Sequence, residues 1–146
     1  MTKLQMWGLF LLRITIGWLF LNAGIAKVIE PTWSAAKYLS AATTFNGFFG
    51  WLASSSMLPI VNFLVEWGLV LMGLALILGV CVRYASYAGA VLMFLFYLPV
   101  LNFPTVGHGY IVDDHIIYIA ALLTLAGFEA GTVWGLENKV KQMFAK

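Results

Sequence analysis

The chain has 146 residues, of which 62% are hydrophobic, 16% aromatic and only 10% charged, with a formal net charge of +2. Soluble domains carry about 25% charged residues, and so short a chain encloses too small a core to bury this much apolar surface, so lipid is the expected solvent. The lysines are scattered, which argues against a nucleic-acid partner, and the single cysteine, Cys81, excludes an internal disulfide and a Cys-x-x-Cys redox pair.

Four apolar segments predict four membrane-spanning helices, because each approaches the roughly 20 residues that cross a bilayer core. They cover about residues 4–29, 59–78, 84–101 and 112–130. The first is too long for a signal peptide and lacks a small-x-small cleavage site. The predicted fold class is therefore all-α, an integral membrane four-helix bundle, with residues 1–146 forming a single membrane domain.

The first segment places five notable residues on one helix face, because they follow each other at intervals of three or four: Arg13, Gly17, Phe20, Gly24 and Lys27. The two glycines would let a neighbouring helix approach closely, within this chain or from a second copy. An arginine at mid-helix costs ~2.5–3.5 kcal/mol on insertion scales, so we expect Arg13 to face the interior. Lys27 lies near the outer boundary, where snorkelling to water is an alternative to a binding role.

The connection over residues 31–56 is rich in aromatic residues and has one charge, Lys37. Amphipathic rings favour the membrane interface. We therefore expect one or two short interfacial helices that lie over the bundle as a candidate lid.

The second segment carries Asn62 and Glu66 on one face. If the first two segments run antiparallel, Glu66 comes level with the stretch from Asn22 to Lys27 and not with Arg13. This predicts a Glu66–Lys27 ion pair, and the alternative reading is a buried pair that only fixes helix register.

The fourth segment begins with two adjacent carboxylates and a histidine, and they are followed by Tyr118. Asp113 is a natural helix N-cap. Asp114 and Tyr118 are four residues apart and share a face, with His115 beside them. Which of the two aspartates faces inward is left open. His108, in the preceding loop, is expected to be exposed.

These polar residues would meet in the outer half of the bundle, because they lie at one membrane depth. The candidate catalytic residues are Glu66, Asp114 and His115. The candidate binding residues in this half are Asn22, Lys27 and Tyr118. No metal or haem is predicted, because both histidines lie near the fourth segment and match no recognised ligand spacing.

The basic residues predict the orientation. With four spans both termini share one side, and that side collects five basic residues against two on the other: Lys3, Arg83, Lys139, Lys141 and Lys146 against Lys27 and Lys37. The positive-inside rule then puts both termini, with the tail over residues 137–146, in the cytoplasm of a multi-pass cell-membrane protein.

Several of these features together resemble the DoxX/DoxD family of four-helix membrane proteins, over about residues 12–136. The residues that carry the resemblance are the Arg13–Lys27 face, Glu66 with the stretch from Gly73 to Arg83, and Asp113-Asp114-His115-Ile116-Ile117-Tyr118. The connection from Trp33 to Leu39 is similar to the DoxD side of the family.

The resemblance implies a membrane subunit of a quinone-linked oxidoreductase, such as thiosulfate:quinone oxidoreductase, which passes thiosulfate electrons to a membrane quinone. It implies functional roles for Arg13, Lys27, Glu66, Arg83 and Asp114 or His115. The chain departs from the family pattern near Gly127–Leu136, where Glu129 stands in place of an expected basic residue and argues against anion binding. The alternatives are a small-molecule carrier or binding protein, or a structural anchor for a soluble redox partner. A homodimer is a further possibility.

Overall fold

The computed structural model of the protein describes residues 1–106 and 109–144. Four long helices dominate it: α1 (Lys3–Val28), α4 (Leu58–Leu78), α5 (Val82–Val100) and α6 (Asp114–Gly127). The all-α prediction is confirmed. His108 and Lys146 lie outside the described residues.

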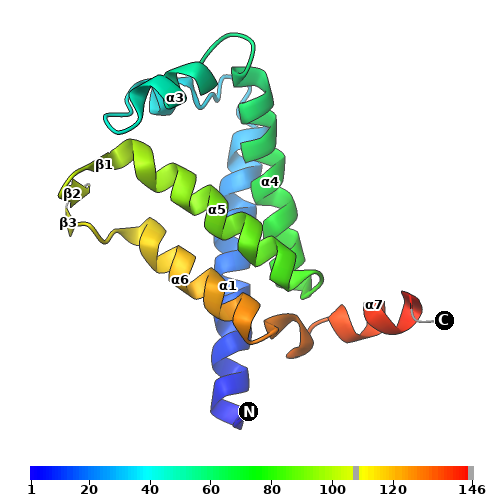
Figure 1. Ribbon diagram of the computed structural model, residues 1–146. Coiled ribbons are helices and arrows are strands. Elements are labelled where there is room, and N and C mark those ends of the chain that lie inside the picture. The colour runs from blue at the N-terminus through cyan, green and yellow to red at the C-terminus, as the bar shows by residue number, and fades with distance from the viewer. Residues whose placement is uncertain (107–108, 145–146) are drawn as a thin grey trace.

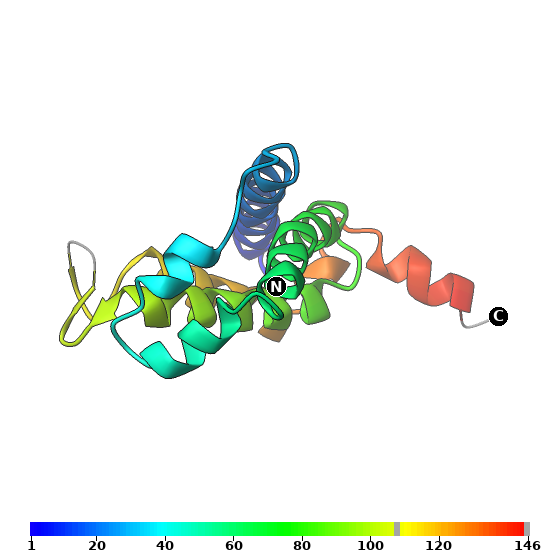
Figure 2. The ribbon, with the colours of Figure 1, turned by 90° about the horizontal axis from the view of Figure 1, so that it is seen from above.

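The long helices form two pairs. α1 packs along α4, and α5 packs along α6. The pairs meet at the end where α4 turns into α5, and they diverge towards the opposite end, where the chain between α1 and α4 lies across the opening (Figures 1 and 2). This divergence is what leaves room for a site between the pairs.

Glycines bring α1 and α4 together. A Cβ atom added at Gly73 would lie 2.5 Å from the backbone nitrogen of Leu21 and 2.8 Å from the carbonyl oxygen of Gly17. One added at Gly24 would lie 2.7 Å from the backbone nitrogen of Val70. Small residues allow such backbone approach in lipid, where no hydrophobic force drives helices together. The glycine face predicted on α1 is therefore confirmed, and its partner is α4 of the same chain.

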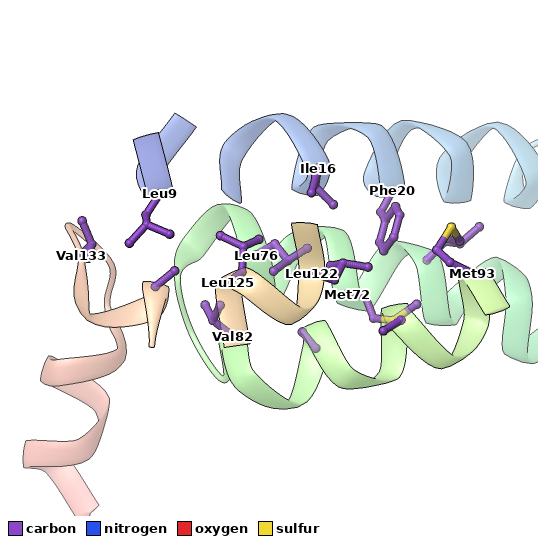
Figure 3. Close-up of a cluster of buried hydrophobic side chains, with 14 of the residues drawn as sticks. Leu9, Ile16, Phe20, Met72, Leu76, Val82, Met93, Leu122, Leu125 and Val133 are labelled. Atoms are coloured by element: carbon purple, nitrogen blue, oxygen red, sulfur yellow. The ribbon is translucent and has the colours of Figure 1, made fainter. Parts of the chain in front are cut away.

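The core lies where the two pairs converge. Phe20, Leu76 and Leu122, from three different helices, are at most 1% exposed, and their side chains point towards one another (Figure 3). Gly89 of α5 gives Phe20 its space, because a Cβ there would lie 2.9 Å from the Phe20 ring. All four long helices thus pack closely together at this end.

The helix lengths correct part of the prediction. By length and apolar composition, α1 with 26 residues and α4 with 21 are candidate membrane spans. α6 has only 14 residues, so the expected segment 112–130 is too long. It begins after Asp113 and ends before Glu129, whose φ of 47° takes the chain out of the helix. The count of four spans therefore stays a prediction.

The connection between α1 and α4 contains two short helices, as predicted: α2 (Ala36–Ser40) and α3 (Asn46–Leu52). Its buried residues Leu39 and Phe49 form a second apolar cluster. The hydroxyls of Thr43 and Thr44 donate hydrogen bonds of 3.0 and 2.6 Å to the carbonyl oxygen of Leu101. We call residues 31–56 the strap, because they are fastened to the ends of both helix pairs.

A small antiparallel sheet follows α5. Its strands are β1 (Leu101–Asn102), β2 (Thr105–Val106) and β3 (Gly109–Tyr110), in the order β1-β2-β3. The sequence did not predict it. After α6 come η1 (Ala130–Thr132), a 3₁₀ turn, and α7 (Glu137–Phe144), which projects away from the helix pairs (Figures 1 and 2).

Candidate functional site

A pocket of about 300 Å³ lies between the diverging helix pairs, under the strap. Every long helix and the strap contribute to its walls: Lys27 of α1, Trp33, Ser34, Ala35 and Tyr38 of the strap, Val65 of α4, Phe96 and Val100 of α5, and His115 of α6. Two predicted site residues, Lys27 and His115, therefore meet here across 88 positions of sequence (115 − 27).

Lys27 is half-buried and has hydrogen-bonding capacity to spare. Its Nζ donates to the carbonyl oxygen of Ala23 at 3.2 Å and lies 5.4 Å from the ring centroid of Trp33. An ammonium group has three N–H donors, and Ala23 is the one acceptor it has among the described residues. Two donors can thus serve a ligand in the pocket.

The predicted Glu66–Lys27 ion pair is wrong. Within the part of the chain that the structure describes, no ion pair joins these two side chains, and the pairs seen include Arg83–Glu129 and His115–Asp113. Val65 lines the pocket, and the next residue on the helix points about 100° away from it. Glu66 is half-buried at this level but is not part of the pocket wall.

His115 is held by Asp113. The Asp113 Oδ2 atom lies 2.6 Å from Nδ1 of His115, while Oδ1 accepts hydrogen bonds from the backbone N–H groups of His115 and Ile116. Asp113 is therefore the N-cap of α6, as predicted, and it also orients the imidazole. An ionised carboxylate only accepts hydrogen bonds, so Nδ1 carries the proton. The Nε2 atom is then the ring nitrogen available to a pocket ligand.

Of the two adjacent aspartates, Asp113 is the one that faces inward. The Asp113 side chain is only 19% exposed, whereas Asp114 is exposed to the surroundings. The face shared by Asp114 and Tyr118 does not point into the pocket. Tyr118 instead lines a shallow groove between α1 and α6, beside Ile16.

Tyr38 is a pocket residue that sequence reasoning missed. Its hydroxyl donates a hydrogen bond to the carbonyl oxygen of Phe96, and the two rings pack edge to face with centroids 6.0 Å apart. Burial, and secondly the negative charge of Asp113, raise the pKa of Tyr38 to about 12. The phenol therefore stays protonated and fastens the strap to α5. The available signal was the aromatic run in the connection, but it did not say which ring faces the pocket.

Asn62 fastens the strap on the other side. Its Oδ1 accepts a 3.0 Å hydrogen bond from the backbone N–H of Ala35, and its Nδ2 lies 3.4 Å from the Ser34 hydroxyl. The strap is thus tied to α4 through Asn62 and to α5 through Tyr38. Both ties are polar contacts at the pocket rim, so they hold Trp33 and Ser34 in place over Lys27.

Arg13 is fully buried, as expected, but it lies far from the pocket. Its Nη1 donates to the carbonyl oxygens of Ala130 at 2.6 Å and Val133 at 3.0 Å, and its Nη2 to that of Trp134 at 3.4 Å. Fourteen residues separate it from Lys27 on one helix, which corresponds to about 21 Å. Arg13 holds the turn that follows α6.

Arg83 and Asn22 are not brought to the pocket either. Arg83 pairs with Glu129 at 2.5 Å, and both side chains are about half exposed, at 48% and 51%. This pair lies at the converging end of the bundle, at the start of α5. The sequence did not predict this pairing of Glu129 with Arg83. Asn22 is exposed on α1.

The pocket combines aromatic walls with a few polar atoms. Trp33, Tyr38 and Phe96 supply ring surface, and Lys27 and Ser34 supply hydrogen-bond donors. The His115 ring meets Phe96 at 89° with centroids 6.4 Å apart. Binding sites for small molecules are typically apolar hollows with a few placed polar groups. This one suits a flat, largely apolar ligand with oxygen atoms to be held.

Fold and pocket together define a helical membrane protein with a ligand-sized aromatic pocket, which carries a few polar groups, at one end of its helix pairs. The model of the DoxX family matches residues 8–101, more than half of the chain. The protein therefore belongs to the DoxX family. The match includes the pocket residues from Lys27 to Val100, and His115 lies beyond it. Searches of the curated proteins and of the solved structures gave no match.

Proposed function

We propose that this protein is the membrane subunit of a quinone-linked oxidoreductase, of the DoxD-like type that passes thiosulfate electrons to a membrane quinone. The observation that carries the proposal is the pocket itself, in which a cation with spare donors and a carboxylate-oriented histidine face an aromatic hollow. Membership of the DoxX family is consistent with it.

The residues present fit a quinone head group. The volume of about 300 Å³ and the three aromatic side chains suit a flat ring. Lys27 and Ser34 would hold a carbonyl oxygen, and when bound the quinone would supply an acceptor for two electrons and two protons. Binding a quinone in this way needs neither a cysteine thiolate nor a phosphate-binding loop from the chain.

Each polar residue then has a definite role. Lys27 stabilises negative charge on an oxygen in the pocket by Coulomb attraction, which is strong where water is excluded. In its doubly protonated form His115 holds a second proton on Nε2, the ring nitrogen turned away from Asp113, and would donate that proton to the oxygen. Asp113 is a positioning residue that keeps the ring oriented and stabilises its protonated form.

We propose that the remaining helices also cross the bilayer, with both termini in the cytoplasm. The pocket would then open towards the outer leaflet, because it lies at the end of α1 remote from the N-terminus. The helix α7, which packs on η1 and projects from the helix pairs, would offer a soluble redox subunit a point of attachment on the cytoplasmic side.

Quinone reduction by the purified protein in lipid, with thiosulfate as the donor, tests the function. Wild type and a Lys37→Met control, which alters an exposed lysine of the strap, should turn over alike. His115→Ala should lose about 100-fold or more, the usual contribution of a general acid. Equal turnover in His115→Ala would contradict the assigned role. Quinone binding without any turnover would identify a carrier or binding protein instead.

A further inference from the structure

A second hollow lies outside the pocket, along the seam between α4 and α5. It is an open groove of about 570 Å³. Its walls are built from apolar residues and one tyrosine, among them Leu64, Gly68 and Leu71 of α4 and Ala88, Val91 and Leu95 of α5. Leu64, Leu71 and Val91 are each more than 60% exposed, so the groove faces the surroundings, which in a membrane protein are lipid chains.

The groove exists because α4 has a glycine in its wall. A Cβ at Gly68 would meet only the Cε atom of Met72, at 3.9 Å. This contrasts with Gly73 and Gly24, whose missing side chains are replaced by the backbone of a neighbouring helix. Gly68 therefore makes no close helix contact, and its effect is to leave space between α4 and α5.

Groove and pocket share their walls. On α4, Leu64 lines the groove and the next residue, Val65, lines the pocket. On α5, Leu95 lines the groove and Phe96 lines the pocket. The two hollows thus lie on different faces of the same two helices, about 100° apart, and they come level with each other where the groove ends at Leu64 and Leu95.

We infer that pocket and groove form one site for an amphiphile, a prenylated quinone whose head group occupies the pocket and whose first isoprenoid units lie in the groove. The inference rests on the proposed function. The groove runs about 12 Å along each of α4 and α5 at 1.5 Å per residue, so it holds an extended segment of the tail and not a second head group. The rest of the tail remains in the bilayer.

Because the groove is apolar, it would bind the tail of a prenylated quinone and would add nothing to the binding of a tailless one. Polar groups are held in the pocket by Lys27 and His115, and the groove offers contact surface with no charge to be desolvated. A tail that lay in the groove would face lipid, so binding would not require exposing it to water.

Photolabelling tests the inference. The probe is a benzoquinone whose alkyl tail carries a diazirine near the ring, added to the full-length protein in lipid nanodiscs, and adducts are mapped by mass spectrometry. We expect adducts on Leu64, Gly68, Val91 or Leu95. An excess of a tailless benzoquinone should abolish them, because the ring anchors the probe.

Two glycine variants sharpen the test. Gly68→Leu fills the groove, and should reduce groove adducts at least ten-fold while the tailless quinone still binds. Gly8→Leu is the matched control, since Gly8 also has open space and lines a different shallow groove between α1 and α6. It should leave labelling unchanged.

The outcomes separate the inference from the function on which it rests. Failure of the tailless quinone to bind at all would overturn the proposed function. Binding of the tailless quinone with adducts along α1 and α6, or unchanged labelling in Gly68→Leu, would overturn the groove assignment alone. Groove labelling by a diazirine phospholipid that excess quinone does not displace would identify the groove as a lipid site and would also overturn it.

Discussion

Arg13 and Lys27 are two cations on one face of one helix, yet their surroundings differ completely. The guanidinium of Arg13 is enclosed, donates to three backbone carbonyls and packs against Gly79 and Gly135, where a Cβ would lie 2.7 Å from Nη1. The ammonium of Lys27 donates to one carbonyl and faces a hollow. Both terminal nitrogens of Arg13 are bound to backbone carbonyls, and only its buried Nε lacks a partner among the described residues. Arg13 therefore supports the fold, whereas Lys27 keeps donors that face a hollow and are available to a ligand.

The difference follows from where the helix pairs converge. Near Arg13 the pairs meet, and the turn after α6 folds back over α1, so that backbone carbonyls from residues 130–134 surround the guanidinium. Near Lys27 the pairs have separated, and only the strap covers the gap. The binding pocket thus lies at the diverging end of the helix pairs, and the tightly packed core lies at the converging end.

The largest expected effect comes from Arg13→Met. It leaves three backbone carbonyls without their donor in a buried setting, and each buried acceptor left unsatisfied costs about 1–3 kcal/mol. The free energy of unfolding, measured by denaturation in detergent, should fall by that order. Unchanged stability would show that the turn after α6 does not depend on Arg13, and it would contradict the structural role assigned to this residue.

Asp113→Asn addresses the pocket end. Asparagine caps a helix nearly as well as aspartate, so the stability of α6 should hardly change. The neutral amide no longer stabilises a charged imidazole, and turnover should fall about ten-fold, which corresponds to about 1.4 kcal/mol. Asp113→Ala should lose the cap as well, at a cost of about 1 kcal/mol. Wild-type turnover in Asp113→Asn would remove the positioning role.

Tyr38→Phe tests how firmly the strap covers the pocket. Loss of the hydrogen bond to the Phe96 carbonyl should cost about 0.5–1.5 kcal/mol, seen as faster hydrogen exchange in α2. The pKa of Tyr38 is raised to about 12, above the ordinary value of about 10. The neutral phenol is therefore favoured by folding, and its stabilising contribution is full below about pH 10 and lost as the pH rises through about 12. The phenylalanine variant should lack this alkaline loss; if it shows the same loss, another group is responsible.

The smallest effect is expected for Arg83→Gln. This third cation pairs with Glu129 where both side chains are about half exposed, and such pairs contribute about 0–1 kcal/mol. Unfolding should shift by about 0.5 kcal/mol or less, and quinone binding should be unchanged. A loss of binding would place a ligand contact at the wrong end of the bundle.

Much of the scaffold could be predicted because its signals are local. Apolar length located the long helices, and spacing of three and four residues identified the buried face of α1, including Gly17 and Gly24. The short polar pattern at Asp113 predicted the cap of α6. Each of these features depends on neighbours within one or two helical turns.

The site was predicted less well because its contacts are distant in sequence. Tyr38 meets Phe96 across 58 positions, and nothing in either local pattern records the partner. Arg13 is bound by carbonyls 117 to 121 positions away, and backbone carbonyls carry no sequence signature. Helix depth alone grouped Glu66 with Lys27, but depth does not say which way a side chain points around its helix.

Binding of a tailless benzoquinone to wild type, Lys27→Met and Lys37→Met, with unfolding followed in the same detergent, tests the central claim most directly. Methionine keeps the length of the side chain and removes its charge, and Lys37 is an exposed lysine of the strap. The account predicts that Lys27→Met binds at least about ten-fold more weakly, or about 1.4 kcal/mol, at unchanged stability, while Lys37→Met matches wild type. Equal affinity in all three proteins, or a loss of stability in Lys27→Met like that expected for Arg13→Met, would contradict it.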